Sequence, residues 1–252
     1  MEIRTGIEVA GLTDVGCQRE NNEDCFSYWE PQDESEFERK GRLAVIADGM
    51  GGYEGGQEAS RLAVDTVLEV YRQTSALDAQ VSLIHALTAA HTRILRFAGE
   101  HPELQGMGTT CTALSITGDR LNFAHVGDSR LYLVRGEQIS RLTKDHSYVG
   151  RLVDSGILSP EEAEAHPQRH ILTAALGAGS EVMPDFPETA ITLQPDDVVI
   201  LCSDGLWGMV KESELHDVGT EKPAAKACRQ LVDLARKRGG PDNITVQVIH
   251  VS

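Results

Sequence analysis

Residues 43–52, which read LAVIADGMGG, form the stretch around which the rest of the sequence is organised. An apolar run rich in β-forming residues ends at Asp48, and this is typical of a buried strand that places one carboxylate in a loop. The glycines that follow allow sharp turns or close approach to an ion or phosphate, and they leave the carbonyl of Gly49 available as a ligand. Taken alone, the pattern is more simply an Asx-type turn after a strand.

Length and composition predict a single globular domain over residues 1–252. No Pro/Ser-rich linker divides the chain, and 40% hydrophobic with 25% charged residues is sufficient for a buried core. The formal net charge of −16 repels the phosphates of nucleic acids and anionic membrane surfaces. We therefore expect no general binding of nucleic acid.

Five cysteines, without a C-x-x-C pair, are typical of reduced thiols in a cytoplasmic protein. The N-terminal residues MEIRTGIEVAG lack the apolar core of a secretory signal. No run of about 18 apolar residues is present that would form a membrane helix. The sequence thus predicts a cytoplasmic monomer with no membrane segment.

On the N-terminal side of residues 43–52, the pattern predicts one strand and two polar loops. Residues 3–13 alternate as a strand does, with Ile3 as an inward-facing position, and residues 13–26 are rich in turn residues. The charge run at 30–42 is typical of a solvated loop. On the C-terminal side, apolar residues three and four apart predict helices over residues 57–73 and from Asp78, which would be the N-cap.

From residue 106 the apolar period changes to two, which indicates strands joined by tight turns in an antiparallel meander. These predicted strands are residues 111–117, 121–126, 130–134 and 138–142. Residues 145–180 lose this regularity and predict a flap-like insert with two short helices, the second beginning at Ser159. The remaining predicted elements are strands at 190–193 and 197–202, a helix at 223–237 and a last strand from Ile244.

Four aspartates each stand beside a small or turn residue where a hydrophobic strand begins or ends. They are Asp48, Asp128, Asp204 and Asp242. Buried carboxylates are costly unless they are paired or bind a metal, and the Lys and Arg residues are too scattered to pair with all of them. Carboxylates that meet at one end of two packed sheets would form a pocket for a hard divalent ion such as Mg²⁺ or Mn²⁺. Arg19, Glu23 and Asp24, in another strand-end loop, strengthen this interpretation.

Six blocks of sequence, in order along nearly the whole chain, resemble the metal-dependent PP2C-type (PPM) protein phosphatases in their compact bacterial form. The blocks are TDVG at 13–16 with Arg19 and NED at 22–24, ADGMGG at 47–52, GMGTT at 106–110, VGDSR at 126–130, CSDGLW at 202–207 and DNIT at 242–245. The resemblance implies an α+β fold, a four-layer α-β-β-α sandwich of two antiparallel sheets flanked by helices. It also implies a metal pair at one edge between the sheets, and it agrees with the order of elements predicted above.

The resemblance assigns the metal pair to specific residues. Asp48 would bridge two Mn²⁺ or Mg²⁺ ions per chain. Asp204 and Asp242 would complete the first site, and the carbonyl of Gly49 would serve the second. Met50 stands where many eukaryotic members have His, so the group that protonates the leaving alkoxide is not identified.

Further roles follow from the same resemblance. Asp24 and Glu23 would lie close to the ions and hold metal-bound waters. Asp128, together with Asp204, matches a weaker third metal site. Arg19 would bind the substrate phosphate through its two-pronged guanidinium, for which Lys is a poor replacement. In this interpretation Arg19, Asp48 and Asp204 are the catalytic residues.

The chemistry of such a site requires no covalent intermediate. A water that bridges two cations loses a proton near neutral pH and attacks phosphorus in line. No cysteine is followed six positions later by arginine, which excludes the usual cysteine-phosphatase loop. The nine histidines are scattered, and each is interpreted as a surface or core residue. Departures from the family pattern are Gly208, Ala174 and the stretch 177–185.

The sequence thus predicts a phosphoserine/phosphothreonine protein phosphatase whose partners are phosphorylated proteins, and which opposes a bacterial Ser/Thr kinase on that kinase and its substrates. One alternative is a pseudophosphatase that binds phosphoproteins without hydrolysis, although the intact aspartates and Arg19 argue against it. A second alternative is a phosphatase for an anti-sigma-factor antagonist. Such enzymes normally carry a sensor domain, for which this chain has no room.

Overall fold

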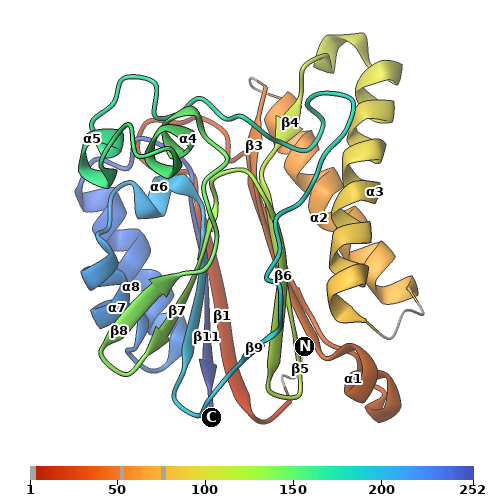
Figure 1. Cartoon of the computed structure of the whole chain (residues 1–252), viewed down its shortest axis with the longest axis vertical. Helices are drawn as coiled ribbons and strands as arrows, with labels where there is room; N and C mark the ends of the chain where they lie inside the picture. The colour runs from red at the N-terminus through yellow and green to blue at the C-terminus, as the bar shows by residue number, and fades with distance from the viewer. Residues whose placement is uncertain (1–3, 52–53, 75–77) are drawn as a thin grey trace.

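Two antiparallel β-sheets pack face to face in the computed structural model, which describes residues 4–51, 54–74 and 78–252 (Figure 1). In spatial order, the strands of the first sheet are β1 (Ile7–Asp14), β11 (Ile244–Val251), β10 (Val198–Cys202), β7 (Arg130–Arg135) and β8 (Gln138–Arg141). Those of the second are β2 (Asp24–Trp29), β3 (Arg42–Met50), β5 (Cys111–Thr117), β6 (Arg120–Val126) and β9 (Ile191–Thr192), and β4 (Gly108–Thr109) pairs with β3. Ile3 and Gly52, for which the sequence made predictions, lie outside the described residues.

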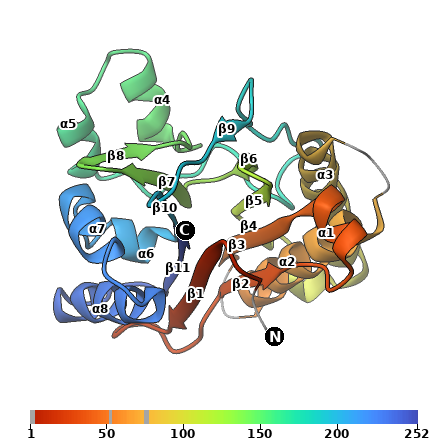
Figure 2. The same ribbon diagram turned by 90° about the horizontal axis from the view of Figure 1, so that it is seen from below.

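Helices cover the outer faces of both sheets (Figure 2). The second sheet is covered by α2 (Gly55–Gln73) and α3 (Ala79–Glu100), and the first by α7 (Glu212–Gly219) and α8 (Ala224–Lys237). Shorter helices are α1 (Glu34–Lys40), η1 (Pro102–Leu104), α4 (Tyr148–Asp154), α5 (Pro160–Glu164) and α6 (Asp204–Trp207). The predicted α-β-β-α sandwich is therefore confirmed. In the part of the chain that the structure describes, no helix is both long and apolar enough to cross a membrane.

Strand β3 shows why the sequence run at 43–47 has no polar residue. Successive side chains of a strand point to opposite faces, and both faces of β3 are covered. Leu43 and Val45 pack in the cluster beneath α2 and α3, whereas Ala44 and Ile46 pack between the two sheets. Burial of each large aliphatic side chain contributes about 1.5–3 kcal/mol, so this strand is anchored from both sides.

The predicted helix starts are present, and so are the two short helices predicted within residues 145–180, which we call the flap. Asp78 is the N-cap of α3, and its carboxylate accepts hydrogen bonds from the backbone N–H groups of Gln80 at 2.8 Å and Val81 at 3.2 Å. Residues 145–180 contain the two short helices α4 and α5. Ser159 begins the second through a reciprocal pair of hydrogen bonds with Glu162.

The prediction of a solvated loop at 30–42 was wrong, because these residues contain α1. Asp33 caps this helix by accepting from the backbone N–H of Glu36 at 2.9 Å. Glutamates occupy the first turn and Arg39 and Lys40 the last, which suits the helix dipole. The helix ends at Gly41, whose φ of 62° favours glycine.

The predicted meander was wrong at its central connection. Strands β5 and β6 pair in the second sheet and β7 and β8 in the first, so residues 127–129 carry the chain from one sheet to the other. Gly127 makes this change of direction with a φ of 111°. The consequence is functional, because Asp128 is placed at the edge where the two sheets meet.

Candidate active site

The acidic residues singled out in the sequence come together at one edge of the two sheets. Asp24 of β2 lies directly opposite Asp48 of β3, Asp204 begins α6 after β10, and Asp242 precedes β11. All of these except Asp24 line one cavity of about 500 Å³. Its lining includes Arg19, Asp48, Gly49, Asp128, His170, Asp204 and Asp242. Both sheets therefore contribute carboxylates to one cavity, and the predicted convergence of Asp48, Asp128, Asp204 and Asp242 is observed.

Position 49 has no room for a side chain because neighbouring backbone atoms crowd it. A Cβ at this position would lie 2.1 Å from the carbonyl oxygen of Gly56 and 2.7 Å from that of Glu23. The N–H of Gly49 donates to the Glu23 carbonyl at 3.1 Å. The absence of a side chain thus allows the start of α2 to approach the end of β3.

Asp24 connects the two sheets through buried hydrogen bonds. Its Oδ2 accepts from the hydroxyl of Ser203 at 2.7 Å and from that of Thr245 at 2.5 Å. Its Oδ1 is buried and has no hydrogen-bond partner among the described residues. A buried carboxylate oxygen without a partner is costly, so this atom is suited to receive a metal-bound water.

Burial and mutual repulsion raise the pKa values of these carboxyl groups. Desolvation is the largest cause for Asp48, whose pKa is raised well above the ordinary value, and the charges of Asp24 and Asp204 add to it. Desolvation also raises the pKa of Asp24 to about 7, and it raises the pKa values of Asp128 and Asp204. The site is therefore short of positive charge, which a divalent cation would supply.

The donor set fits hard cations such as Mn²⁺ or Mg²⁺. It consists of carboxylates and the Gly49 carbonyl, and oxygen ligands of this kind are the ones that such ions prefer. Within the described residues, no three acidic, His or Cys side chains already stand in ligand geometry around one point. Carbonyl and water oxygens would therefore have to complete any coordination shell in this cavity.

Arg19 lies at the rim of the cavity with its guanidinium half exposed. Its Nη2 donates to Oδ2 of Asp242 at 2.8 Å, which orients the group toward the carboxylates. Glu23 lies nearby and is partly buried. Its pKa is raised, because desolvation outweighs the opposing effect of the Arg19 charge. Arg19 therefore has donors left for an incoming anion, whereas the predicted water-holding role of Glu23 stays a prediction.

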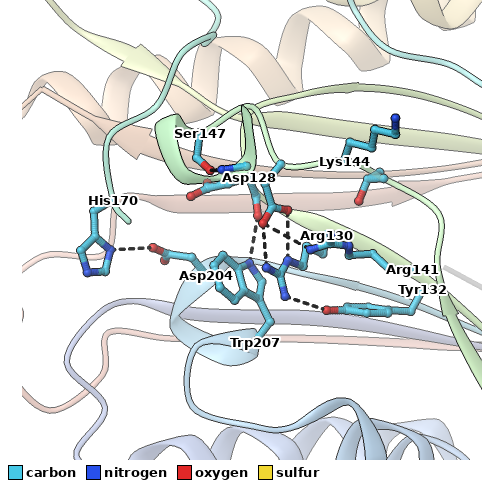
Figure 3. Close-up of polar contacts among 12 residues, drawn as sticks. Asp128, Arg130, Tyr132, Arg141, Lys144, Ser147, His170, Asp204 and Trp207 are labelled. Carbon is cyan, nitrogen blue, oxygen red and sulfur yellow. Dashed lines mark hydrogen bonds and ion pairs between the residues drawn. The ribbon is translucent and has the colours of Figure 1, made fainter. Parts of the chain in front are cut away.

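Two features of the site were not predicted from the sequence. His170, which was interpreted from the sequence only as a surface or core residue, lines the cavity, and its Nδ1 lies 4.0 Å from Oδ2 of Asp204 (Figure 3). It comes from the irregular flap, where no periodic pattern gave a signal. The indole Nε1–H of Trp207 donates to the carbonyl of Asp128 at 2.9 Å. Trp207 was part of a matched block, but the block alone assigned it no contact.

Trp207 also packs against Arg130 of β7, which forms an ion pair with a residue of the flap. The guanidinium carbon of Arg130 lies 3.5 Å from the centre of the indole ring, and Arg130 donates to both oxygens of Asp145 at 3.0 and 2.7 Å. Figure 3 shows the Arg130 guanidinium between the Trp207 ring and the hydroxyl of Tyr132. Asp145 begins the flap, so this cluster ties the flap to the loop that carries Asp128.

Comparison with known proteins decides the family. The model of the protein phosphatase 2C family matches residues 20–245. The chain belongs to the protein phosphatase 2C family. It is 38% identical to protein phosphatase PhpP of Streptococcus pneumoniae over 98% of both chains. It is also 36% identical to the serine/threonine protein phosphatase PstP of Mycobacterium tuberculosis, over 97% of this chain and 45% of that protein.

Solved structures of PP2C-family proteins share the fold over nearly the whole chain. The serine/threonine phosphatase of S. agalactiae has a TM-score of 0.89 at 34% identity and covers 98% of this chain and all of that one. The catalytic domain of PstP, solved in complex with two manganese ions, has a TM-score of 0.83 at 34% identity over 97% and 98% of the two chains.

Proposed function

We propose that this protein hydrolyses phosphoserine and phosphothreonine in proteins with a water activated by two divalent cations. The observation that carries the proposal is the cavity in which buried carboxylates from both sheets meet beside the half-exposed Arg19. In the assignment we propose, Asp48 would bridge the ions, Asp204 and Asp242 would complete one site, and the Gly49 carbonyl would serve the other.

When bound, the ions supply a water whose pKa is near 7 and neutralise charge on the phosphoryl group. The protein's own residues select and orient the substrate. Arg19 binds the phosphate oxygens with donors that Asp242 leaves free. Asp24 holds solvent through its unpartnered Oδ1, and its other oxygen is fixed by Ser203 and Thr245.

A third metal ion and a proton for the leaving group complete the proposed chemistry. Asp128, with Asp204, would hold a weaker third ion. The hydrogen bond from Trp207 to the carbonyl of Asp128 fixes the loop that carries Asp128. The thioether of Met50 cannot donate a proton, so protonation of the leaving alkoxide is left to solvent or to another group.

We further propose that the whole chain acts as one cytoplasmic, monomeric phosphatase domain that opposes a Ser/Thr kinase. Curated relatives of nearly the same length are named as protein phosphatases, which supports one phosphatase domain that spans the chain. The charge of −16 repels other acidic surfaces at long range, so the local positive charge of the ions would direct phosphorylated segments to the cavity.

Metal-free protein tests the proposal directly. Protein treated with EDTA and then dialysed should be inactive toward p-nitrophenyl phosphate and phosphopeptides, and Mn²⁺ should restore both activities. Calorimetric titration with Mn²⁺ should give two strong sites in the wild type and fewer in Asp48→Asn. Activity that persists in excess EDTA, or equal Mn²⁺ binding by the variant, would contradict the proposal.

A further inference from the structure

A second cavity, of about 400 Å³, lies beneath the flap and next to the carboxylate cavity. The flap helices α4 and α5 contribute Val149, Val153 and Ala163 to its walls, and α6 contributes Trp207. Three residues line both cavities: Asp128, Arg169 and Trp207. A polypeptide whose phosphorylated residue occupies the first cavity therefore has the second within reach.

The inner end of this second cavity offers little to a polar ligand. Two of the charged groups there, Arg130 and Asp145, are already paired, because Arg130 donates to both oxygens of Asp145 and stacks on Trp207 (Figure 3). Among the described residues that line the cavity, no buried side-chain nitrogen or oxygen lacks a hydrogen-bond partner. What remains available is apolar surface, from Val149, Val153, Ala163 and the indole ring.

The rim of the cavity differs from its interior. Lys144 and Arg169 line it and are exposed to solvent. In Figure 3 the Lys144 side chain points away from the Arg130–Trp207 pair. The exposed charges at the rim are of both signs, since Asp154 and Glu212 also line it, together with Arg141. A charged rim around apolar groups suits a polypeptide that inserts one apolar side chain, because its backbone and charged groups stay in water.

We propose that this cavity, which we call the flap pocket (Val149, Val153, Ala163 and Trp207), binds a large apolar side chain of the phosphoprotein substrate close to the phosphorylated residue. The inference rests on the proposed function and adds a substrate preference to it. The volume is within the range of cavities that enclose ligand groups. Burial of a leucine-sized group corresponds to a preference of roughly tenfold or more in kcat/KM.

The test uses phosphoserine peptides in which the flanking residues are alanine and leucine is placed at one position at a time. Positions up to about four residues on either side are sufficient, since an extended chain spans roughly 3.5 Å per residue. The wild type should prefer leucine at one position by about tenfold over the all-alanine peptide. Ala163→Phe fills the flap pocket and should remove this preference, expressed as the ratio of the two kcat/KM values.

Ala165→Phe is the matched control, because Ala165 lies at the end of the same helix, is exposed, and does not line the cavity. It should keep the leucine preference. Val153→Phe fills the pocket from the other helix and serves if Ala163→Phe does not fold. Hydrolysis of p-nitrophenyl phosphate, which has no flanking residues, shows that each variant retains a working site.

The outcomes separate the flap pocket from the proposed function. A wild type that hydrolyses p-nitrophenyl phosphate but prefers leucine at no position would overturn the flap pocket alone, as would an undiminished preference in both filled variants. A wild type that hydrolyses neither p-nitrophenyl phosphate nor any phosphopeptide would contradict the proposed function itself.

Discussion

At the scale of single residues, the cavity is defined by carboxylates that repel one another. Asp48, Asp128 and Asp204 all have raised pKa values, first because they are buried and then because their neighbours are acidic. The metal-free protein is therefore expected to be destabilised by its own site. Tight binding of cations often has this cost in stability, because the negative charges that bind the cations repel one another when no cation is bound.

The substitution Asp204→Asn tests both the metal-binding role of one carboxylate and its repulsion of the others. We expect kcat to fall at least about a hundredfold, because loss of a metal ligand should cost more than loss of a supporting group. In metal-free protein the same change should leave the fold intact and raise the melting temperature, since it removes one repelling charge. Kinetics with Mn²⁺ and thermal unfolding in EDTA measure the two effects, and near-wild-type turnover would remove Asp204 from the metal site.

Arg19→Ala should act mainly on substrate binding. The Arg19–Asp242 pair is half exposed, so its loss should change the free energy of unfolding by less than about 1 kcal/mol. KM for phosphopeptides should rise about tenfold or more, and Arg19→Lys should restore little because the two-pronged contact is lost. If KM stays unchanged in Arg19→Ala, the guanidinium does not contact the phosphate.

His125 makes the stability depend on pH. Burial lowers its pKa to about 4, and Thr112 and the carbonyl of Lys144 hold the neutral ring by hydrogen bonds. Because the pKa is higher in the unfolded chain, near 6.5, stability is retained above that pH and lost as the pH falls toward 4. This histidine alone should cost about 2 kcal/mol between pH 7 and pH 5.

Comparison of the wild type with His125→Asn isolates that contribution. Urea unfolding of both proteins at pH 7 and pH 5 should give a smaller pH-dependent loss in the variant. The carboxylates of the cavity titrate in both proteins, so their effect cancels in the difference. Equal losses in the two proteins would show that His125 is not the group that titrates.

At the scale of elements, the flap is joined to the rest of the molecule by a buried ion pair. Arg130 and Asp145 have side chains only 13% and 12% exposed, and the pair packs against Trp207. Through Trp207 it also contacts the carbonyl of Asp128. The position of the flap and that of the Asp128 loop are therefore set by the same cluster.

Asp145→Ala should destabilise the protein by about 3–5 kcal/mol, because it leaves the Arg130 charge buried without its partner. Asp65→Ala is the control, since its partner Arg61 and Asp65 itself are each about half exposed, and it should cost less than about 1 kcal/mol. Denaturant unfolding compares the two variants. Equal effects would show that the Arg130–Asp145 pair does not anchor the flap.

Sequence patterns predicted the long elements because their periodicity is strong and their ends are marked. The α2 and α3 stripes, the Asp78 cap and the Ser159 start needed only local signals. Helix α1 was missed although Asp33 caps it, because none of its residues is buried and it has no apolar stripe. The change of sheet at Gly127 was missed because turn residues alone do not say which strand the next one joins.

At the scale of the whole molecule, the cavity depends on which strand ends the topology brings to one edge. Asp48 and Asp242 lie almost two hundred residues apart in the sequence, and only the placement of β3 and β11 in facing sheets brings them together. Matched motifs indicated this convergence by family resemblance. His170 and the Arg130–Asp145–Trp207 cluster could not be predicted in this way, because their contacts depend on how the flap packs.

The proposed activity requires these distant carboxylates to hold two divalent cations. Crystals grown with Mn²⁺, with anomalous diffraction recorded at the manganese edge, test it most directly. We expect two manganese peaks in the cavity, one between Asp48, Asp204 and Asp242 and the other between Asp48 and the Gly49 carbonyl. Crystals of active protein with no manganese in that cavity would contradict it.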